Sequence, residues 1–314
     1  MGDFSEAVEQ HRRELHVHCY RMLGSFDEAE DMVQETFLRA WRRRDSLQSE
    51  EGLRAWLYRI ATNACLDFLR ASPRRPEPRE APVVADSWLE WPTRTSVPWL
   101  QPYPDDLLDA VIERETIELA FLSAVQHLAP RQRAVVILRD VLGWSAQETA
   151  EALETSVAAV KSALQRARPV LREHLPGQRL ASATEEEAAV VRRYVDALEQ
   201  ADPSLLPELL RADVYQTMPP SPMWILGREA FMASWTPAMA GEGAWGDWRL
   251  VATRANRQPA VAAYLRRPVD SLYRPYWLGV LRVEGGLITQ ITTFGHDMFP
   301  EFGLPDSFPP AASS

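Results

Sequence analysis

Four cations stand close together on this chain with no acid between them. Lys161, Arg166, Arg168 and Arg172 occupy the stretch from 161 to 172, although the formal net charge of all 314 residues is −10. Ammonium and guanidinium groups bind phosphates, and polar side chains between them can reach the edges of bases. The stretch therefore has the chemistry of a nucleic-acid contact within an acidic protein.

Two helix starts would position these cations. Ser145 with Glu148 three residues later forms a capping-box pattern, and Ser156 can cap a second helix that carries the cations. Gly143 suits the end of the preceding helix. Together these signals predict a helix-turn-helix.

The second helix divides into an inner and an outer face. Apolar side chains of both helices can pack inward between them: Ala150 and Leu153 from the first helix, and Val157, Val160 and Leu164 from the second. The outer face is suited to the major groove of DNA. We expect DNA contacts from Ala158, Ala159, Lys161, Ser162, Gln165, Arg166 and Arg168. A helical hairpin with a solvated basic face is the alternative that spacing alone leaves open.

Composition and the placement of cysteine and histidine limit the classes of protein to which this chain can belong. Hydrophobic residues make up 46% of the chain, yet no stretch approaches the ~20 apolar residues of a membrane span. The first residues, MGDFSEAVEQHRREL, contain no apolar signal segment, so we expect a cytoplasmic protein with no membrane partner. Cys19 and Cys65 are expected to be buried thiols. His11, His16 and His18 do not converge on one helix face, so no metal site is expected. No cofactor is expected either.

The character of the chain changes several times along its length. Residues 1–71 have helical periodicity, with Gly24 ending one helix. Residues 72–110 form a linker rich in proline and tryptophan, and its Trp88, Trp91 and Trp99 are unusual for a flexible tether. Helical periodicity returns over residues 111–176.

The C-terminal part has a different pattern. Residues 184–300 begin with a helix and continue with β-branched and aromatic segments, such as YWLGVLRV and LITQITTFG. Turns are predicted at EGG, residues 284–286, and around Pro259. This predicts an α+β domain with a curved sheet, followed by a tail over 301–314.

Two stretches resemble one known family. LAPRQRAVVILRDVLGWSAQETAEALETSVAAVKSALQRARPVLRE is similar to region 4 of bacterial extracytoplasmic-function sigma factors, and LHVHCYRMLGSFDEAEDMVQETFLRAWRR with LRAWLYRIATNACLDFLR is similar to region 2. They stand in the family's order and cover about the first 175 residues. The resemblance implies two all-α domains in a protein that binds core RNA polymerase, recognises minus-thirty-five and minus-ten promoter elements and initiates transcription.

The resemblance also implies roles for individual residues. The minus-thirty-five element would be read by the basic helix, although Ala163 stands where the family often has arginine. The clamp helices of the polymerase would be bound by Asp31, Gln34, Glu35, Phe37 and Arg39. The minus-ten element would be recognised and opened by Arg54, Trp56, Arg59 and Asn63. The alternatives are a solvated face for the carboxylates and a core position for Trp56.

The C-terminal domain resembles the SnoaL-like, ketosteroid-isomerase-like cone fold that some such sigma factors carry. The similarity rests on VVRRYVDALEQADPSLLPELLRADV, GREAFMASW and LRVEGGLITQITTFGHDMF. An isomerase of this fold needs a basic carboxylate and donors for an enolate oxygen. Tyr194 matches a donor, but Met218 occupies the position of the base, so proton-transfer chemistry is not expected. A ligand pocket is expected at Tyr194, Met218, Trp277 and His296.

The resulting hypothesis is a sigma factor, not an enzyme, whose fused C-terminal domain regulates it in cis. Its partners would be core polymerase, promoter DNA and a small-molecule ligand of the C-terminal domain. One alternative is a bifunctional protein with an active isomerase-like or cyclase-like domain. A simple helix-turn-helix repressor is another, but it leaves residues 27–71 without a role.

Overall fold

The structure is a computed structural model that describes residues 2–47, 49–71, 100–108, 116–175, 184–219 and 221–310. Trp88, Trp91 and Trp99 of the linker lie outside the described residues. The chain forms two compact units. The described part of the first unit comprises residues 2–47, 49–71, 100–101, 106–108 and 116–175, and that of the second comprises 102–105, 184–219 and 221–310.

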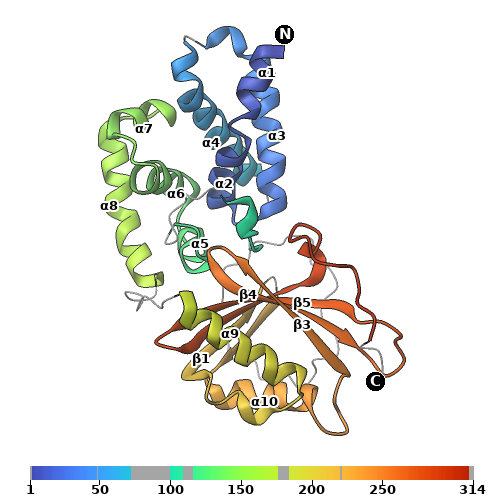
Figure 1. Cartoon of the computed structure of the whole chain (residues 1–314). Coiled ribbons are helices and arrows are strands. Elements are labelled where there is room, and N and C mark those ends of the chain that lie inside the picture. Colours follow the sequence, from blue (N-terminus) through green and yellow to red (C-terminus); the bar gives the residue numbers. More distant parts are fainter. Residues whose placement is uncertain are drawn as a thin grey trace. The chain divides into compact units, whose positions relative to one another are not determined.

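The first unit begins with a group of packed helices (Figure 1). Helix α2 ends at Gly24, which has a left-handed backbone (φ 75°), as the sequence predicts. Ser25 then caps α3 by accepting a hydrogen bond from the Glu28 N–H. The bounds are α1 Gly2–Glu9, α2 Arg12–Leu23, α3 Phe26–Arg42 and α4 Leu53–Ala71, with short 3-10 turns at Arg44–Ser46 and Glu50–Gly52.

The second half of this unit contains the predicted helix-turn-helix. The Ser145 hydroxyl accepts a hydrogen bond from the Glu148 N–H at 3.1 Å, and the Glu148 carboxylate accepts one from the Ser145 N–H at 2.6 Å. Ser156 caps the second helix, and Glu154 makes the turn with φ 50°. The bounds are α5 Leu119–Gln126, α6 Pro130–Val136, a π-turn Ile137–Val141, α7 Ala146–Ala152 and α8 Val157–His174.

Two buried arginines join the halves of this unit. Arg133 of α6 donates hydrogen bonds to the carbonyl of Met22 in α2 and, at 2.9 Å, to that of Val125. Arg21 of α2 donates to the Thr116 hydroxyl at 2.6 Å. Because each guanidinium satisfies backbone or hydroxyl oxygens inside the protein, these contacts fix α2 against the second half of the unit.

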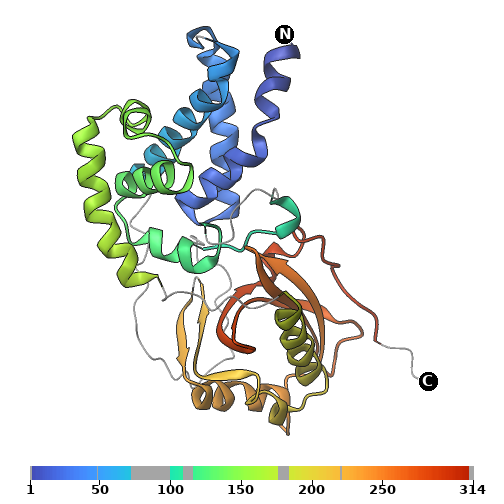
Figure 2. The ribbon, with the colours of Figure 1, turned by 60° about the vertical axis from the view of Figure 1, so that its left-hand side comes forward.

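The second unit is built on a six-stranded mixed sheet in the order β2-β1-β6-β5-β4-β3. Strand β1 is parallel to β6, and the other neighbours are antiparallel. The sheet curves around α9, and α10 covers its β1 end (Figure 2). The bounds are α9 Thr184–Glu199, β1 Leu210–Met218, β2 Ser221–Leu226, α10 Arg228–Met239, β3 Asp247–Ala255, β4 Gln258–Arg266, β5 Arg274–Glu284 and β6 Leu287–Gly295, with 3-10 turns at Pro203–Leu205 and His296–Met298. A further 3-10 turn, Asp105–Leu107, lies in the linker.

Both faces of strand β4 are buried, which explains its nearly continuous apolar sequence. Alternate residues such as Val261 and Leu265 belong to the core beneath α9 and α10. On the other face, Tyr264 packs edge-on against Phe299 and Phe308 and donates its hydroxyl hydrogen to the Pro305 carbonyl at 2.9 Å. Residues 299–308, most of which belong to the predicted tail, therefore cover the sheet.

One predicted turn lies elsewhere in the structure. The β3–β4 hairpin turns at Asn256 and Arg257, whose φ angles are 56° and 58°, and not around Pro259. Pro259 lies in β4 opposite Arg254. Asn tolerates the left-handed conformation that such tight turns require, whereas proline cannot adopt it. The predicted EGG turn is present, with Gly285 and Gly286 both at positive φ.

Candidate nucleic-acid interface

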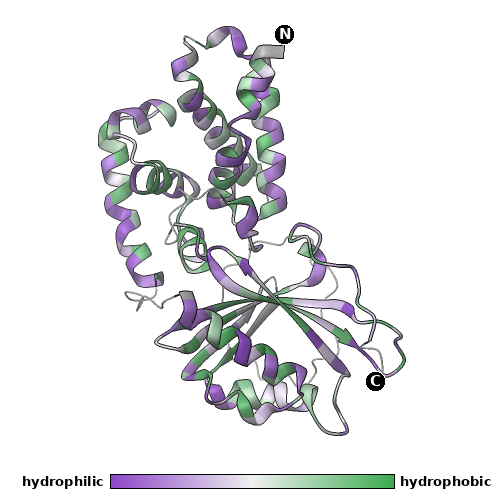
Figure 3. Cartoon of the chain, viewed as in Figure 1, coloured by the Kyte–Doolittle hydropathy of each residue, from purple (hydrophilic) through white to green (hydrophobic). Residues whose placement is uncertain are grey.

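Helix α8 presents its predicted DNA-contact residues along one broad face. Ala158, Ala159 and Lys161 are exposed near its N-terminus, and its buried residues include Val160 and Leu164. At 100° per residue, the predicted contact residues span about half of the helix circumference. In Figure 3 this helix carries hydrophilic and hydrophobic stripes. The remaining predicted residues are Gln165, Arg166 and Arg168, which are exposed, and Ser162, which is half-buried.

The two arginines of this face have local partners. Arg166 donates to the Ser162 hydroxyl at 2.6 Å, which lies one turn earlier. Arg168 pairs with Asp140 at 3.2 Å. Both guanidinium groups are exposed, so water screens these contacts and phosphate can compete for them. Ala163 is buried between the helices, so no base readout comes from this position.

The four predicted minus-ten residues lie on α4 but not on one face. Arg59 and Asn63 are one turn apart and both contact the helix-turn-helix. Arg59 pairs with Glu154 at 3.4 Å, and the Asn63 amide donates to the Ala152 carbonyl at 3.4 Å. Trp56 shares the face of Asn63, is half-buried and contacts the Phe4 ring at 6.5 Å between centroids.

Arg54 is turned roughly 160° away from Trp56 around the helix. Its guanidinium pairs with Glu14 of α2 at 2.6 Å and lies over the Tyr58 ring. Tyr58 donates its hydroxyl hydrogen to the same Glu14 carboxylate at 3.0 Å. Partial burial raises the pKa of the Glu14 carboxyl, but the hydrogen bonds from Arg54, His11 and Tyr58 outweigh burial and leave the pKa lowered. Glu14 therefore fixes Arg54 as a charged pair.

The predicted polymerase-binding residues lie along α3. Asp31 and Gln34 are exposed, and Phe37 is half-buried under the Arg12 guanidinium. Arg39 pairs with Glu35 at 2.7 Å and with Asp67 of α4 at 2.9 Å. This face is held by ion pairs that leave carboxylate oxygens facing solvent.

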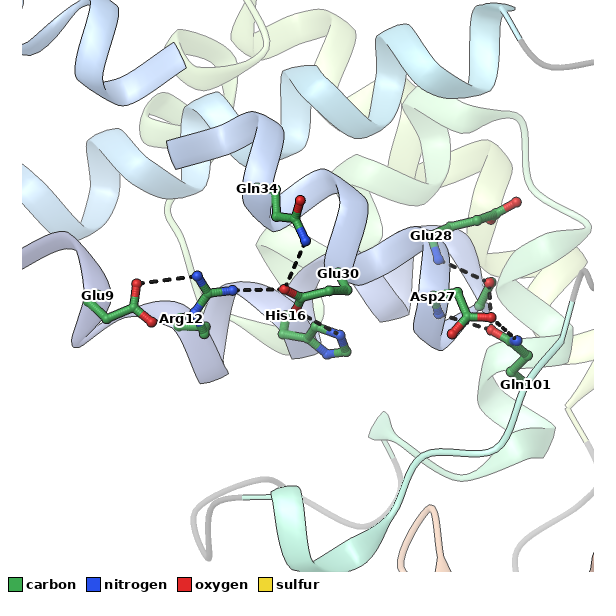
Figure 4. A network of polar contacts seen from close by, with 9 residues as sticks. Glu9, Arg12, His16, Asp27, Glu28, Glu30, Gln34 and Gln101 are labelled. Carbon is green, nitrogen blue, oxygen red and sulfur yellow. Dashed lines mark hydrogen bonds and ion pairs between the residues drawn. The ribbon is translucent and has the colours of Figure 1, made fainter. Parts of the chain in front are cut away.

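A linker residue completes the start of α3 (Figure 4). The Gln101 side-chain carbonyl accepts hydrogen bonds from the Ser25 hydroxyl at 2.7 Å and from the Asp27 N–H at 3.0 Å. Its amide donates to the Asp27 carboxylate at 2.7 Å. Farther along, Glu30 accepts from Arg12 and Gln34. The linker thus contributes part of the N-terminal cap of α3.

The predicted pocket residues of the second unit separate into two groups. Tyr194, Met218 and Trp277 are buried in one core cluster with α9 and α10. Burial raises the pKa of the Tyr194 hydroxyl. His296 is exposed in the 3-10 turn after β6, so the structure does not bring it to the others. The reason is that β6 ends at Gly295, before the chain reaches that histidine.

The chain matches known families along most of its length. Residues 7–75 match sigma-70 region 2, residues 118–169 match sigma-70 region 4, and residues 191–291 match the SnoaL-like domain. The ECF RNA polymerase sigma factor SigG of Mycobacterium tuberculosis is 43% identical over 320 residues, which cover 98% of this chain and 85% of that protein. The chain belongs to the ECF RNA polymerase sigma factors.

Further relatives agree with this membership. The sigma factor SigW of Bacillus subtilis is 32% identical over 174 residues, covering 55% of this chain and 88% of that protein. The crystal structure of the Mycobacterium tuberculosis sigma factor SigJ is similar with a TM-score of 0.62 at 22% identity, and covers 98% of this chain and all of that one. That similarity supports helical sigma domains followed by an α+β domain.

Two ion pairs of this sigma factor that position predicted site residues could not be predicted from the sequence. Glu14 lies 40 residues before Arg54, and Glu154 lies 95 residues after Arg59. Such distant pairs leave no periodic signal in the sequence.

Of the helices that the structure describes, none is long and apolar enough to cross a membrane. Within the same residues, no cluster of three or more His, Cys, Asp or Glu side chains is arranged to hold a metal ion.

Proposed function

We propose that this sigma factor binds core RNA polymerase through α3, reads the minus-thirty-five element through α8 and opens the minus-ten element through α4. The observation that carries the proposal is the exposed basic face of α8, set by the Ser145 and Ser156 caps on the region that matches sigma-70 region 4. Cations on this face suit phosphates, and Gln165 suits base edges. A helix-turn-helix repressor would not need the matched region 2.

The second part of the proposal is that the C-terminal unit regulates the sigma factor in cis and forms no covalent bond. Met218 stands where a ketosteroid isomerase has its base, and it is 1% exposed at the end of β1. A thioether cannot abstract a proton from carbon. Small-molecule sites are apolar clefts with a few polar groups, and the surroundings of the Tyr194 hydroxyl have that composition. A ligand acts on transcription only through unequal affinity for active and inactive forms.

Run-off transcription with purified core polymerase tests both parts. The intact chain should direct initiation from its promoter, and a chain ending at residue 183 should still bind polymerase but change promoter-dependent transcription at least severalfold, in either direction. A cut after Phe294, which removes the segment over Tyr264, is the second variant. Equal transcription by all three chains, together with turnover of polyketide or steroid substrates by the intact chain, would replace cis regulation by the enzyme alternative.

A further inference from the structure

Helix α8 has a narrow sector of its surface that contains no cation. At 100° per residue, Ala158, Ser162 and Gln165 fall within about 60° around the helix axis, and we call these three residues the central line. The buried Val160 and Ala167 lie on the opposite side of the helix. The central line is therefore the part of α8 that faces most directly away from the rest of region 4.

The lysine and the arginines of α8 lie outside the central line. Lys161 and Arg168 are turned roughly 70–90° from its middle on one side, and Arg166 is turned roughly 70° on the other. Arg172 lies ~10 Å beyond Gln165 along the helix axis. Cations on both margins of a helix suit the two phosphate backbones that border a groove, and phosphate contacts position a protein without reading sequence. Base edges are thus left to the central line.

The central line presents a methyl group, a hydroxyl group and an amide. The side chain of Ala158 ends at Cβ and is exposed, so the feature of a base edge that it can recognise is the C5-methyl group of thymine. The exposed amide of Gln165 can bond to N6 and N7 of adenine. The Ser162 hydroxyl accepts from Arg166 at 2.6 Å, and a hydroxyl contacts any base without selecting one.

We infer that Ala158 and Gln165 set the sequence preference of α8, with thymine at the base pair that faces Ala158 and adenine at the base pair that faces Gln165. This inference rests on the proposed reading of the minus-thirty-five element by α8 and names the bases that are read. The two residues are ~10.5 Å apart along the helix axis. A helix lying along the groove would therefore place the two A·T pairs about three steps of 3.4 Å apart.

Selection of duplexes randomised in their upstream half, by the full chain with core polymerase, tests the adenine contact. The selected element should contain two A·T pairs about three steps apart. Gln165→Glu should change the preference at one of these pairs from adenine to cytosine, because a carboxylate accepts a hydrogen bond from N4 of cytosine. The preference at the other pair should stay the same.

Uracil tests the Ala158 contact because it lacks only the C5-methyl group of thymine. Replacing the selected thymine by uracil should weaken binding of the intact chain about fourfold through loss of one buried methyl group. Ala158→Gly should bind the two duplexes equally. Ala233→Gly, the same change at an exposed alanine of α10, should keep the fourfold ratio. A ratio of two affinities measured on one protein does not depend on the stability of the variant.

The outcomes separate this inference from the proposed function. A selected element without the two A·T pairs, a thymine-to-uracil ratio that persists in Ala158→Gly, or a Gln165→Glu variant that keeps adenine would overturn the inference and leave α8 as the helix that binds the element. Failure of the chain with core polymerase to select any upstream sequence would overturn the proposed reading by α8, and this inference with it.

Discussion

Arg166 and Arg168 are the residues on which the DNA-binding proposal can be tested most directly. Each already makes one contact, with the Ser162 hydroxyl and with the Asp140 carboxylate. Surface pairs of this kind contribute about 0–1 kcal/mol, which is less than a phosphate contact in a DNA complex recovers through counterion release. The two guanidinium groups are therefore available to DNA.

We expect Arg166→Ala and Arg168→Ala to weaken promoter binding and to flatten its dependence on salt. Each lost phosphate contact should reduce the slope of log K against log salt by about 0.9. Fluorescence anisotropy at several salt concentrations measures that slope. Arg193→Ala, which removes an exposed arginine paired with Glu208 in the other unit, is the matched control. Unchanged slopes in both α8 variants would show that the basic face of this helix is solvated and does not contact DNA phosphates.

His18 links the stability of region 2 to pH. Its Nε2 lies 2.8 Å from the Thr62 hydroxyl, which itself donates to the Tyr58 carbonyl, so the imidazole must donate to Thr62. Complete burial lowers the pKa of His18 to about 3. The folded chain therefore keeps this imidazole neutral at pH values where the unfolded chain takes up a proton.

We expect stability to fall as pH drops below about 6.5, because only the unfolded state binds a proton at His18 between that pH and about 3. This single group contributes at most about 1.4 kcal/mol per pH unit. His18→Gln should be less stable at pH 8, where it loses the imidazole contact, and the deficit in Tm should shrink toward pH 5. Calorimetry of the full chain measures Tm at each pH, and His174→Gln, a change at an exposed histidine, is the control. A constant deficit would contradict it.

At the scale of single elements, α3 separates polymerase binding from DNA binding. Asp31 and Glu35 lie on its polar side, away from buried Ala29 and Val33. We expect the double variant Asp31→Lys, Glu35→Lys to lose association with core polymerase and to keep its helical content, because both changes are made at the surface. Co-elution with core polymerase measures the first effect and circular dichroism the second.

The matched control for α3 reverses two exposed carboxylates outside this helix, Asp45→Lys and Glu51→Lys. Both lie beyond the end of α3 and change the net charge of the chain by the same amount. Should the folded α3 variant assemble with polymerase as well as this control does, the contact inferred for α3 is wrong.

Helix ends were predictable from the sequence because their signals are local. Gly24 ends α2 by its left-handed backbone, and Ser145 and Ser156 begin α7 and α8 through hydrogen bonds to N–H groups three residues later. The outward face of α8 follows from the same helical period. These features depend on neighbours within one turn of helix, which the sequence lists in order.

Contacts between elements could not be predicted in the same way. The faces of α4 show this, because Arg54 is held by Glu14 and Arg59 by Glu154, partners that lie 40 and 95 residues away. Likewise, nothing local shows that Gln101 caps α3 or that His296 lies outside the core. Such placements arise from the packing of whole helices and strands.

At the scale of the whole first unit, the contact between α4 and α7 conflicts with promoter geometry. Asn63 bonds to Ala152, and α8 begins five residues later, within about 19 Å of chain. The names minus-thirty-five and minus-ten place the two promoter elements about 25 base pairs apart, or ~85 Å at 3.4 Å per base pair. Regions 2 and 4 in the arrangement described here therefore cannot contact both elements at once.

We expect Glu154→Asn to favour separation of the two regions, because it removes the partner of Arg59 while asparagine still tolerates the left-handed turn. The gain in affinity for DNA with both elements should not exceed about fivefold, since an exposed ion pair is worth up to about 1 kcal/mol. Glu151→Asn removes a neighbouring exposed carboxylate that contacts Gln147 and not α4, so it controls for charge. Equal gains from the two variants would contradict this expectation.

The hydrogen bond between Asn63 and Ala152 also determines the order in which the two promoter elements can be bound. A chain in which α4 still contacts α7 first binds a single promoter element, at a rate proportional to the concentration of DNA. The second element can bind only after regions 2 and 4 separate. This separation is a first-order step, so its rate does not depend on the concentration of DNA. Stopped-flow traces with rising promoter concentration should therefore reach a plateau rate, and that plateau is the opening rate of the protein itself.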